Sequence, residues 1–339
     1  MDKNRIQWID LTKAFAIFLV VVLHVSAPIL SGYNILPKSS WLMGNFYNSF
    51  GRIGVPLFVM ISGFLLLRHK EDEPIKTFFG KRFKRILLPF LSWSFIYFLW
   101  SNLSKNQDIN FANFLEVIYK PQYYHLWFMY MIIGLYLITP VLRAVIKNGE
   151  EKITKYLMFL LTGYALLPLL FQNTLLIIIP NVFVLYFVLG FYLGNKENKN
   201  IRKSYLIEVY LICYVITFLG TLYLTQKNNG VYDPFFHEST GPILILMTIC
   251  VFMLLKKITI NNVRVNRFIE IISKNSFGIY LSHILVIVTL DHGIFGIGFG
   301  WNSMNPLLSI PLLSISVFSI SFLLVFILGK IPLLRRILV

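Results

Sequence analysis

Ten apolar segments, separated by short polar stretches, take up most of the chain. They cover residues 12–31, 53–67, 86–103, 126–142, 156–171, 174–194, 204–224, 241–255, 276–291 and 306–329. A helix needs about 20 apolar residues to cross the hydrocarbon core of a bilayer, and these segments lie near that length. Because a helix satisfies its own backbone hydrogen bonds without water, the pattern predicts an all-α, polytopic membrane protein of about ten transmembrane helices.

The Lys and Arg residues are distributed unevenly between the polar stretches. When alternate stretches are assigned to opposite sides, 26 of the 31 basic residues share a side with both ends of the chain. The five on the other side are Lys38, Arg52, Lys105, Lys120 and Lys227. Since positively charged loops stay in the cytoplasm, we expect both termini to be cytoplasmic.

Composition agrees with lipid as the main solvent. The mean hydropathy is +0.70 and 57% of residues are hydrophobic, which is too much apolar surface for a soluble fold. The net charge of +16 would suit nucleic acid, but its confinement to one side is explained by membrane orientation, so no nucleic-acid partner is expected. No linker or repeat divides the sequence, and no Cys/His cluster has metal-ligand spacing. We expect one transmembrane domain over residues 1–339, with no soluble domain and no metal.

One histidine falls deep within the first segment. His24 lies eleven residues beyond Lys13, or about 16 Å along a helix, so it lies past the middle of the bilayer. An imidazole at that depth is costly unless it has a partner. It is either a structural residue bonded to a neighbouring helix or a base in a polar cavity, and ionisable groups inside membranes favour the second interpretation.

Two further histidines come at or near membrane segments. His283 follows Tyr280 by three residues, so the two share a helix face, and structural and functional roles are equally open. His125 begins the fourth segment and is followed closely by Trp127, a residue type that often anchors helices at the interface. The other histidines are expected to be solvated in loops or at the interface: His69, His237 and His292.

Two arginine positions stand out. Arg82 and Arg85 are three residues apart before the third segment, where they either only set orientation or present two guanidinium groups to a phosphate. Arg52 lies on the side where arginine is scarce. It either extends to the interface or holds an anionic or hydroxyl-rich ligand. The Ser62-Gly63 pair that follows permits close approach of another helix.

These motifs resemble the membrane-bound acyltransferase-3 family, which modifies bacterial surface carbohydrates. The family's basic-x10-His pattern matches Lys13 and His24. The other matching motifs follow in family order over residues 5 to 330, and they are Pro56 to Phe64, Arg82 with Arg85, Lys120 to Phe128, and Ser276 to His283. Trp8-Ile9-Asp10 and Tyr124 to Phe128 are most similar to the branch that O-acetylates enterobacterial common antigen. Lys13 departs from the arginine of many relatives and lacks its bidentate fork.

The resemblance implies a multi-pass O-acyltransferase of the bacterial cytoplasmic (inner) membrane. Such an enzyme moves an acyl group, usually acetyl, from cytoplasmic acyl-CoA to a hydroxyl of a surface polysaccharide or its lipid-linked precursor. It implies His24 as base or acyl acceptor, with Lys13 and Asp10 as further catalytic residues. Arg82, Arg85 and Lys13 would bind the CoA phosphates. The residues assigned to the acceptor are Arg52, His125, Trp127, Tyr280 and His283.

Two other classes of function compete with acyl transfer. Ten spans would also suit a transporter or flippase of a lipid-linked glycan. All 15 acidic residues lie in loops or near segment ends, whereas proton-coupled transporters usually carry carboxylates in mid-membrane. A sensory or scaffold protein is disfavoured because no soluble domain is evident. Consumption of acetyl-CoA without acceptor would distinguish the enzyme from a transporter.

Overall fold

The computed structural model describes residues 6–68, 73–104, 115–118, 120–148, 151–170, 182–197, 200–293 and 298–338. The regular structure of these residues is helical throughout. The first half contains α1 (Gln7–Leu30), α2 (Lys38–Gly51), α3 (Gly54–Leu67), α4 (Ile75–Arg82), α5 (Leu88–Ser104), α7 (Trp127–Asn148) and α8 (Glu151–Leu170). The second contains α9 (Phe183–Asn195), α10 (Lys203–Lys227), α11 (Pro242–Lys256), α12 (Val263–Asp291), α13 (Pro306–Leu328) and α14 (Pro332–Leu338).

Eight helical stretches among the described residues are long and apolar enough to cross a membrane. They are Gln7–Leu30, Lys38–Leu67, Ile75–Ser104, Tyr124–Lys147, Lys203–Lys227, Phe235–Lys256, Val263–Asp291 and Pro306–Leu328. Helix α9 is a shorter apolar helix, and α8 occupies the expected fifth segment. The expected all-α, polytopic architecture is thereby confirmed. The cytoplasmic location of the termini stays a prediction.

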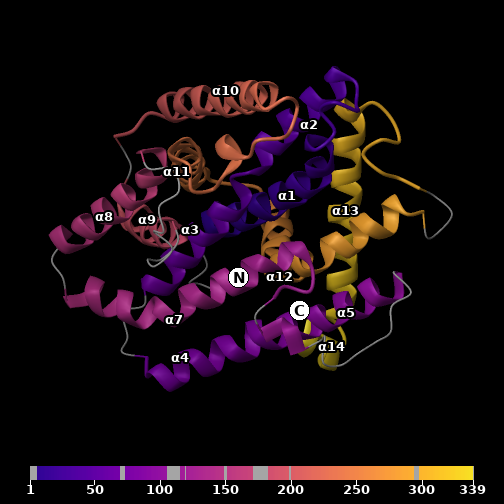
Figure 1. Ribbon diagram of the computed structural model, residues 1–339. Coiled ribbons are helices and arrows are strands. Elements are labelled where there is room, and N and C mark those ends of the chain that lie inside the picture. Colours follow the sequence, from indigo (N-terminus) through magenta and orange to yellow (C-terminus); the bar gives the residue numbers. More distant parts are fainter. Residues whose placement is uncertain are drawn as a thin grey trace.

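Helix α1 lies at the centre of the bundle, in contact with α2, α3, α11, α12 and α13 (Figure 1). Helices α2 and α3 form one broken helix that runs back along α1. Close contacts record this antiparallel path, because Gly44 meets Ile29, Gly51 meets Leu23, and Gly54 meets Ala16. The second membrane segment therefore begins at Lys38, well before residue 53, and Arg52 lies at its break.

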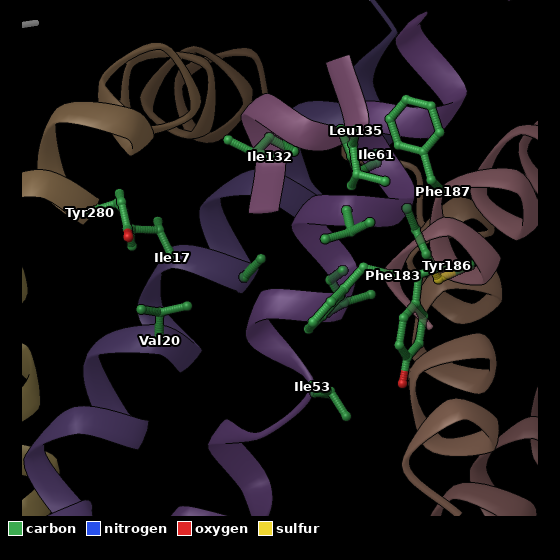
Figure 2. Close-up of a cluster of buried hydrophobic side chains, with 14 of the residues drawn as sticks. Ile17, Val20, Ile53, Ile61, Ile132, Leu135, Phe183, Tyr186, Phe187 and Tyr280 are labelled. Atoms are coloured by element: carbon green, nitrogen blue, oxygen red, sulfur yellow. The ribbon is translucent and has the colours of Figure 1, made fainter. Parts of the chain in front are cut away.

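A single apolar cluster joins α1, α3, α7, α9 and α12. Figure 2 shows members of this cluster, including Val20 on α1, Ile61 on α3 and Tyr280 on α12. Helices α3 and α9 cross with almost no separation, since a Cβ at Gly63 would overlap the backbone of Phe187 and one at Gly190 would overlap that of Met60. The close approach predicted for Ser62-Gly63 is thus confirmed.

The helices at the Lys13 end of α1 form the base on which the site is built. Helix α4 passes into α5 through one π-helical turn, Phe83–Leu87. Helix α14 follows α13 and packs against α5, where the indole of Trp93 donates to the carbonyl of Leu338 (3.0 Å). Figure 1 shows α14 lying close to α5 at this end of the bundle.

Candidate active site

A cavity of about 460 Å³ extends from the charged end of α1 towards the middle of the bundle. Its lining comes from α1, α3, α4, the π turn, α7 and α12. The charged lining residues are Lys13, Glu73, Lys81, Arg82, Arg85 and Lys274. Val20, Phe128 and Tyr280 also line it. Because Lys13 and Val20 are seven residues apart on α1, the cavity runs about 10 Å along that helix.

The three residues expected to bind CoA phosphates line this one cavity. Lys13 comes from α1, Arg82 from the end of α4, and Arg85 from the π turn. The turn has more than 3.6 residues, so it changes the angle between the two arginine side chains relative to a regular helix. Arg85 also lines a second cavity, whereas Arg82 does not.

Arg82 is held by an acidic residue that sequence reasoning did not single out. Its Nη1 lies 3.1 Å from a carboxylate oxygen of Glu73, and its guanidinium lies 4.2 Å from the ring centroid of Phe78. Lys81 and Arg143 contact the same carboxylate at 3.0 and 3.5 Å. Arg82 therefore helps to hold Glu73, which Arg143 of α7 also contacts, and Arg85 is the arginine whose charge is less compensated here.

Glu73 is a strongly perturbed acid outside the membrane segments. Its side chain is only 5% exposed. Burial alone would raise the pKa of this carboxyl group, but hydrogen bonds from Lys81 and Arg82, together with their charges, outweigh that effect and lower the pKa to about 2. The carboxylate is therefore ionised at any physiological pH.

Three histidines form a cluster beyond the end of the cavity. The ring centroids of His24 and His283 are 5.1 Å apart, those of His125 and His283 5.3 Å, and those of His24 and His125 6.5 Å. His125 and His283 are 1% and 0% exposed, and His24 is half-buried. His24 lies four residues, or about 6 Å, beyond Val20 on α1. The structure thus unites three residues that are more than 100 positions apart in sequence.

The hydrogen bonding of this cluster leaves nitrogen atoms available. The Nδ1 of His283 lies 2.6 Å from the carbonyl oxygen of Tyr280, which can only accept, so Nδ1 carries the proton. The Nε2 of neutral His283 then has a free lone pair. Neither this atom nor either ring nitrogen of His125 has a hydrogen-bond partner among the described residues. No group of three or more His, Cys, Asp or Glu side chains in that part of the chain could hold a metal ion.

Tyrosines frame the three histidines. The hydroxyl of Tyr280 donates to the backbone carbonyl of His125 (2.6 Å), and that of Tyr97 donates to the carbonyl of Leu281 (2.8 Å). The ring of Tyr124 lies 5.5 Å from that of His24. Tyr97 was not predicted, because one tyrosine within an apolar segment gives no sequence signal. Tyr124 was included only as part of a motif.

Arg52 lies beside α1 near the level of His24. Its Nε donates to Asn48 (2.9 Å), and the amide of Asn48 donates to the carbonyl of Leu23, the neighbour of His24 (3.1 Å). Its Nη2 donates to the hydroxyl of Tyr232 (2.9 Å). Arg52 is therefore part of a polar network next to the histidine cluster.

That network continues into the polar stretch between α10 and α11. The hydroxyl of Tyr232 lies 2.8 Å from Nδ1 of His237, whose Nε2 lies 2.8 Å from the hydroxyl of Ser49. His237 is 1% exposed, so the expectation that it is solvated is wrong. The physical reason is that the hydroxyls of Ser49 and Tyr232 satisfy both ring nitrogens, so the ring loses no hydrogen bonds when it is buried.

Two other predicted site residues have different surroundings. Trp127 is 41% exposed and packs against Phe183 (centroids 5.6 Å apart), and its role in acceptor binding stays a prediction. The carboxylate of Asp10 accepts a hydrogen bond from the hydroxyl of Ser273 (2.6 Å). Ser273 also lines the first cavity, which places Asp10 next to the cavity wall. The pairing of Asp10 with Lys13 stays a prediction.

Comparison with known proteins agrees with this arrangement. A protein-family model described as an acyltransferase domain matches residues 6–326. The chain belongs to this acyltransferase family. The match includes every predicted site residue and confirms the family indicated by the motifs. The branch that acts on enterobacterial common antigen stays a prediction.

Two curated relatives are similar to parts of the chain or to most of it. The succinoglycan biosynthesis protein ExoH of Rhizobium meliloti (strain 1021) is 29% identical over 191 residues, and the match covers 50% of each chain, so the chain spans about half the length of ExoH. The putative acetyltransferase ORF330 of Acidianus two-tailed virus is 26% identical over 316 residues, covering 88% of each chain. No solved structure matches.

Proposed function

We propose that this membrane acyltransferase moves an acyl group, usually acetyl, from acyl-CoA at the cytoplasmic face to a hydroxyl of a surface polysaccharide or its lipid-linked precursor. The observation that carries the proposal is the basic cavity that ends about one helical turn from His24. A phosphate-bearing donor with a long arm suits such a cavity, because its charged end and its reactive end need different surroundings. The proposed location is the bacterial inner membrane.

The donor would enter from the side of Lys13. Lys13, Arg82 and Arg85 would contact its phosphates, and the arm would extend between apolar walls towards Val20 and Tyr280. The thioester carbonyl would then lie near the histidine cluster. Because Tyr280 donates its hydroxyl proton to the carbonyl of His125, its main role is to hold His125 in place.

His24 would act as base or as acyl acceptor. As a base, its imidazole takes the proton of the sugar hydroxyl, the oxygen attacks the thioester carbon, the C–S bond breaks, and the imidazolium returns the proton to the CoA thiolate. As an acceptor, a ring nitrogen attacks the thioester carbon, the C–S bond breaks, and the proton of the other ring nitrogen passes to the CoA thiolate; the sugar hydroxyl then attacks the acyl-imidazole, the C–N bond breaks, and the hydroxyl proton returns to the ring. The free lone pair of His283 Nε2, on a ring 5.1 Å from that of His24, supports a role in proton handling.

The acceptor would approach from the opposite side, where Arg52 and His125 lie around His24. Arg52 offers charged hydrogen-bond donors to sugar oxygens, and its network with Asn48 and Tyr232 fixes its position. The name of ExoH refers to biosynthesis of succinoglycan, a polysaccharide, and this supports a glycan acceptor for the present chain.

The direct test is acetyl transfer by purified protein in proteoliposomes. We expect slow hydrolysis of acetyl-CoA without acceptor and faster consumption when surface glycan from the host cell is added. Mass spectrometry should detect acetyl groups on the glycan of cells that carry the wild-type protein and not on that of cells that carry His24→Ala. Movement of glycan across the membrane without any consumption of acetyl-CoA would identify the protein as a flippase or transporter instead.

Donor binding gives a second test. The double variant Arg82→Ala/Arg85→Ala should bind acetyl-CoA more weakly, by about 1.5–3 kcal/mol for each charge-assisted contact that is lost. Lysine at either position should restore part of the affinity. Unchanged affinity in calorimetry would leave these arginines as orientation signals only.

A further inference from the structure

A second cavity of about 720 Å³ adjoins the first at the charged end of the bundle. The two share three basic lining residues, Lys81, Arg85 and Lys274. The second cavity extends from them to Lys330, Arg335 and Arg336, which follow α13 or belong to α14. No acidic side chain appears in its described lining. The proposed function does not use this second cavity.

The positive charge in this cavity is only partly compensated. Lys81 pairs with Glu73 at 3.0 Å, and Lys274 pairs with Glu270 at 2.7 Å. No acidic side chain in the described part of the chain pairs with Arg335 or Arg336. Cytoplasmic orientation explains why many cations lie on this side. It does not explain why they line one hollow that shares three basic residues with the first cavity.

Packing against α5 sets the position of α14, so specific contacts fix this wall of the second cavity. Trp93 on α5 is 2% exposed, and its indole donates to the backbone carbonyl of Leu338. The ammonium of Lys330 lies 4.9 Å from the ring centroid of Phe326, another lining residue. These contacts hold the last described turn of the chain against α5, with Arg335 and Arg336 at the wall of the cavity.

We propose that the second cavity binds the 3′-phosphorylated nucleotide end of acyl-CoA, with Lys330, Arg335 and Arg336 on the 3′-phosphate. The three shared residues would contact the pyrophosphate, and the acyl-bearing arm would occupy the first cavity. This deepens the proposed function and rests on it. The order of groups in the ligand, from thioester through pyrophosphate to 3′-phosphate, follows the order of the linings from Val20 through Arg85 to Arg335.

An anionic lipid headgroup presents the same phosphate chemistry, and the lining residues that the two cavities share decide between the two ligands. A headgroup would fill the second cavity alone and would leave the shared boundary with the first unexplained. Coenzyme A needs both spaces, since its pyrophosphate and its 3′-phosphate are separated from its thiol by a long arm. Because phosphates are held by fork-like guanidinium contacts, paired arginines are suited to the terminal phosphate.

The test compares coenzyme A with dephospho-coenzyme A, which lacks only the 3′-phosphate. Isothermal titration should show that wild-type protein binds coenzyme A more tightly than the dephospho form. In Arg335→Ala/Arg336→Ala, affinity for coenzyme A should fall by about tenfold or more, since tenfold is the loss expected for even one good charged contact. Affinity for dephospho-coenzyme A should stay within about twofold, and that retained binding reports an intact fold. Arg264→Ala removes an exposed charge on α12 that lines neither cavity, and it should change neither affinity.

Three outcomes would overturn the assignment. One is equal wild-type affinity for the two ligands, and another is an equal loss for both in the double variant. The third is unchanged coenzyme A binding combined with weaker binding to vesicles of phosphatidylglycerol, which would assign the cavity to lipid. Failure of wild-type protein to bind coenzyme A at all would instead refute the proposed function on which this assignment depends.

Discussion

At the level of single residues, the proposed chemistry centres on His24, whose ring lies among two other imidazoles and a tyrosine. His24→Ala should leave folding and CoA binding nearly intact, since the side chain is half-buried and outside the donor cavity. Turnover should fall by about 10²–10⁴-fold, as expected for loss of a general base. The measurement is transfer per correctly folded molecule. Poor folding with normal turnover in the surviving fraction would identify a structural histidine.

Tyr232 allows a separate prediction about the acceptor side. Its hydroxyl joins Arg52 to His237, and burial raises the pKa of this phenol, so it stays protonated at neutral pH and remains able to donate. Tyr232→Phe should lower kcat/KM for the glycan by roughly tenfold, because Arg52 loses a fixed partner, while the KM for acetyl-CoA should not change. Tyr223→Phe, at an exposed tyrosine on α10, is the matched control. Equal kcat/KM values for the glycan in the two variants would mean that Arg52 does not contribute to acceptor binding.

At the level of helices, ionic contacts and small residues set how the elements meet. Glu73 connects the start of α4 to Arg143 on α7, and Gly63 and Gly190 let α3 and α9 cross closely. The first connection is polar and depends on pH, whereas the second is apolar and does not. The α4–α7 connection therefore has an acid limit that the α3–α9 crossing lacks.

Acid titration should reveal that limit. Because the pKa of Glu73 is lowered from its ordinary value of 4.5 to about 2, its contribution to stability is complete above about pH 4.5 and is lost as the pH falls towards 2. Glu73→Gln should lower the midpoint of thermal unfolding at pH 7, and its difference from wild type should shrink below pH 4.5. If the difference in unfolding midpoint between the two proteins stays constant down to pH 2.5, the charge of this carboxylate does not contribute to stability.

Most of the helices could be predicted from the sequence. Every expected span contains a helix in the described residues, because an apolar run of about 20 residues has few alternatives in a bilayer. Helix α2 was missed, since Asn45, Asn48 and Ser49 give it a polar sequence although all three are buried. Their partners are Leu23, Phe218 and His237. Hydropathy does not register polar groups that are satisfied by distant residues.

The candidate site was predicted unevenly for the same reason. Lys13, Arg82 and Arg85 belong to motifs and do line one cavity. The sequence alone could not predict that His125 and His283 lie close to His24, because the three residues belong to different helices. The support of Arg52 by Tyr232 is a contact across 180 positions that no local pattern contains.

For the whole molecule, the unequal distribution of charge predicts orientation. Helix α10 begins at Lys203 and ends at Lys227, and positions 204 and 228 at its two ends are exposed. In intact cells, a membrane-impermeant maleimide should label Asn228→Cys and not Ser204→Cys. Background should be low because Cys213 and Cys250 are buried. Labelling of Ser204→Cys alone would show that the orientation is opposite to the predicted one, and it would exclude entry of cytoplasmic acyl-CoA at Lys13.

Bacterial membranes store energy as a proton gradient, and a continuous file of water through a protein would discharge it. Val20, Phe128 and Tyr280 line the inner end of the first cavity, and the rings of Phe128 and Tyr280 are 5.2 Å apart. In proteoliposomes with a trapped pH dye, Phe128→Ser should leak protons, whereas Phe128→Leu should stay tight. Equal leakage in both would place the seal elsewhere. We therefore expect the side chains at this end of the cavity to insulate the membrane as well, so that their replacement would harm a cell even where the proposed acyl transfer continues.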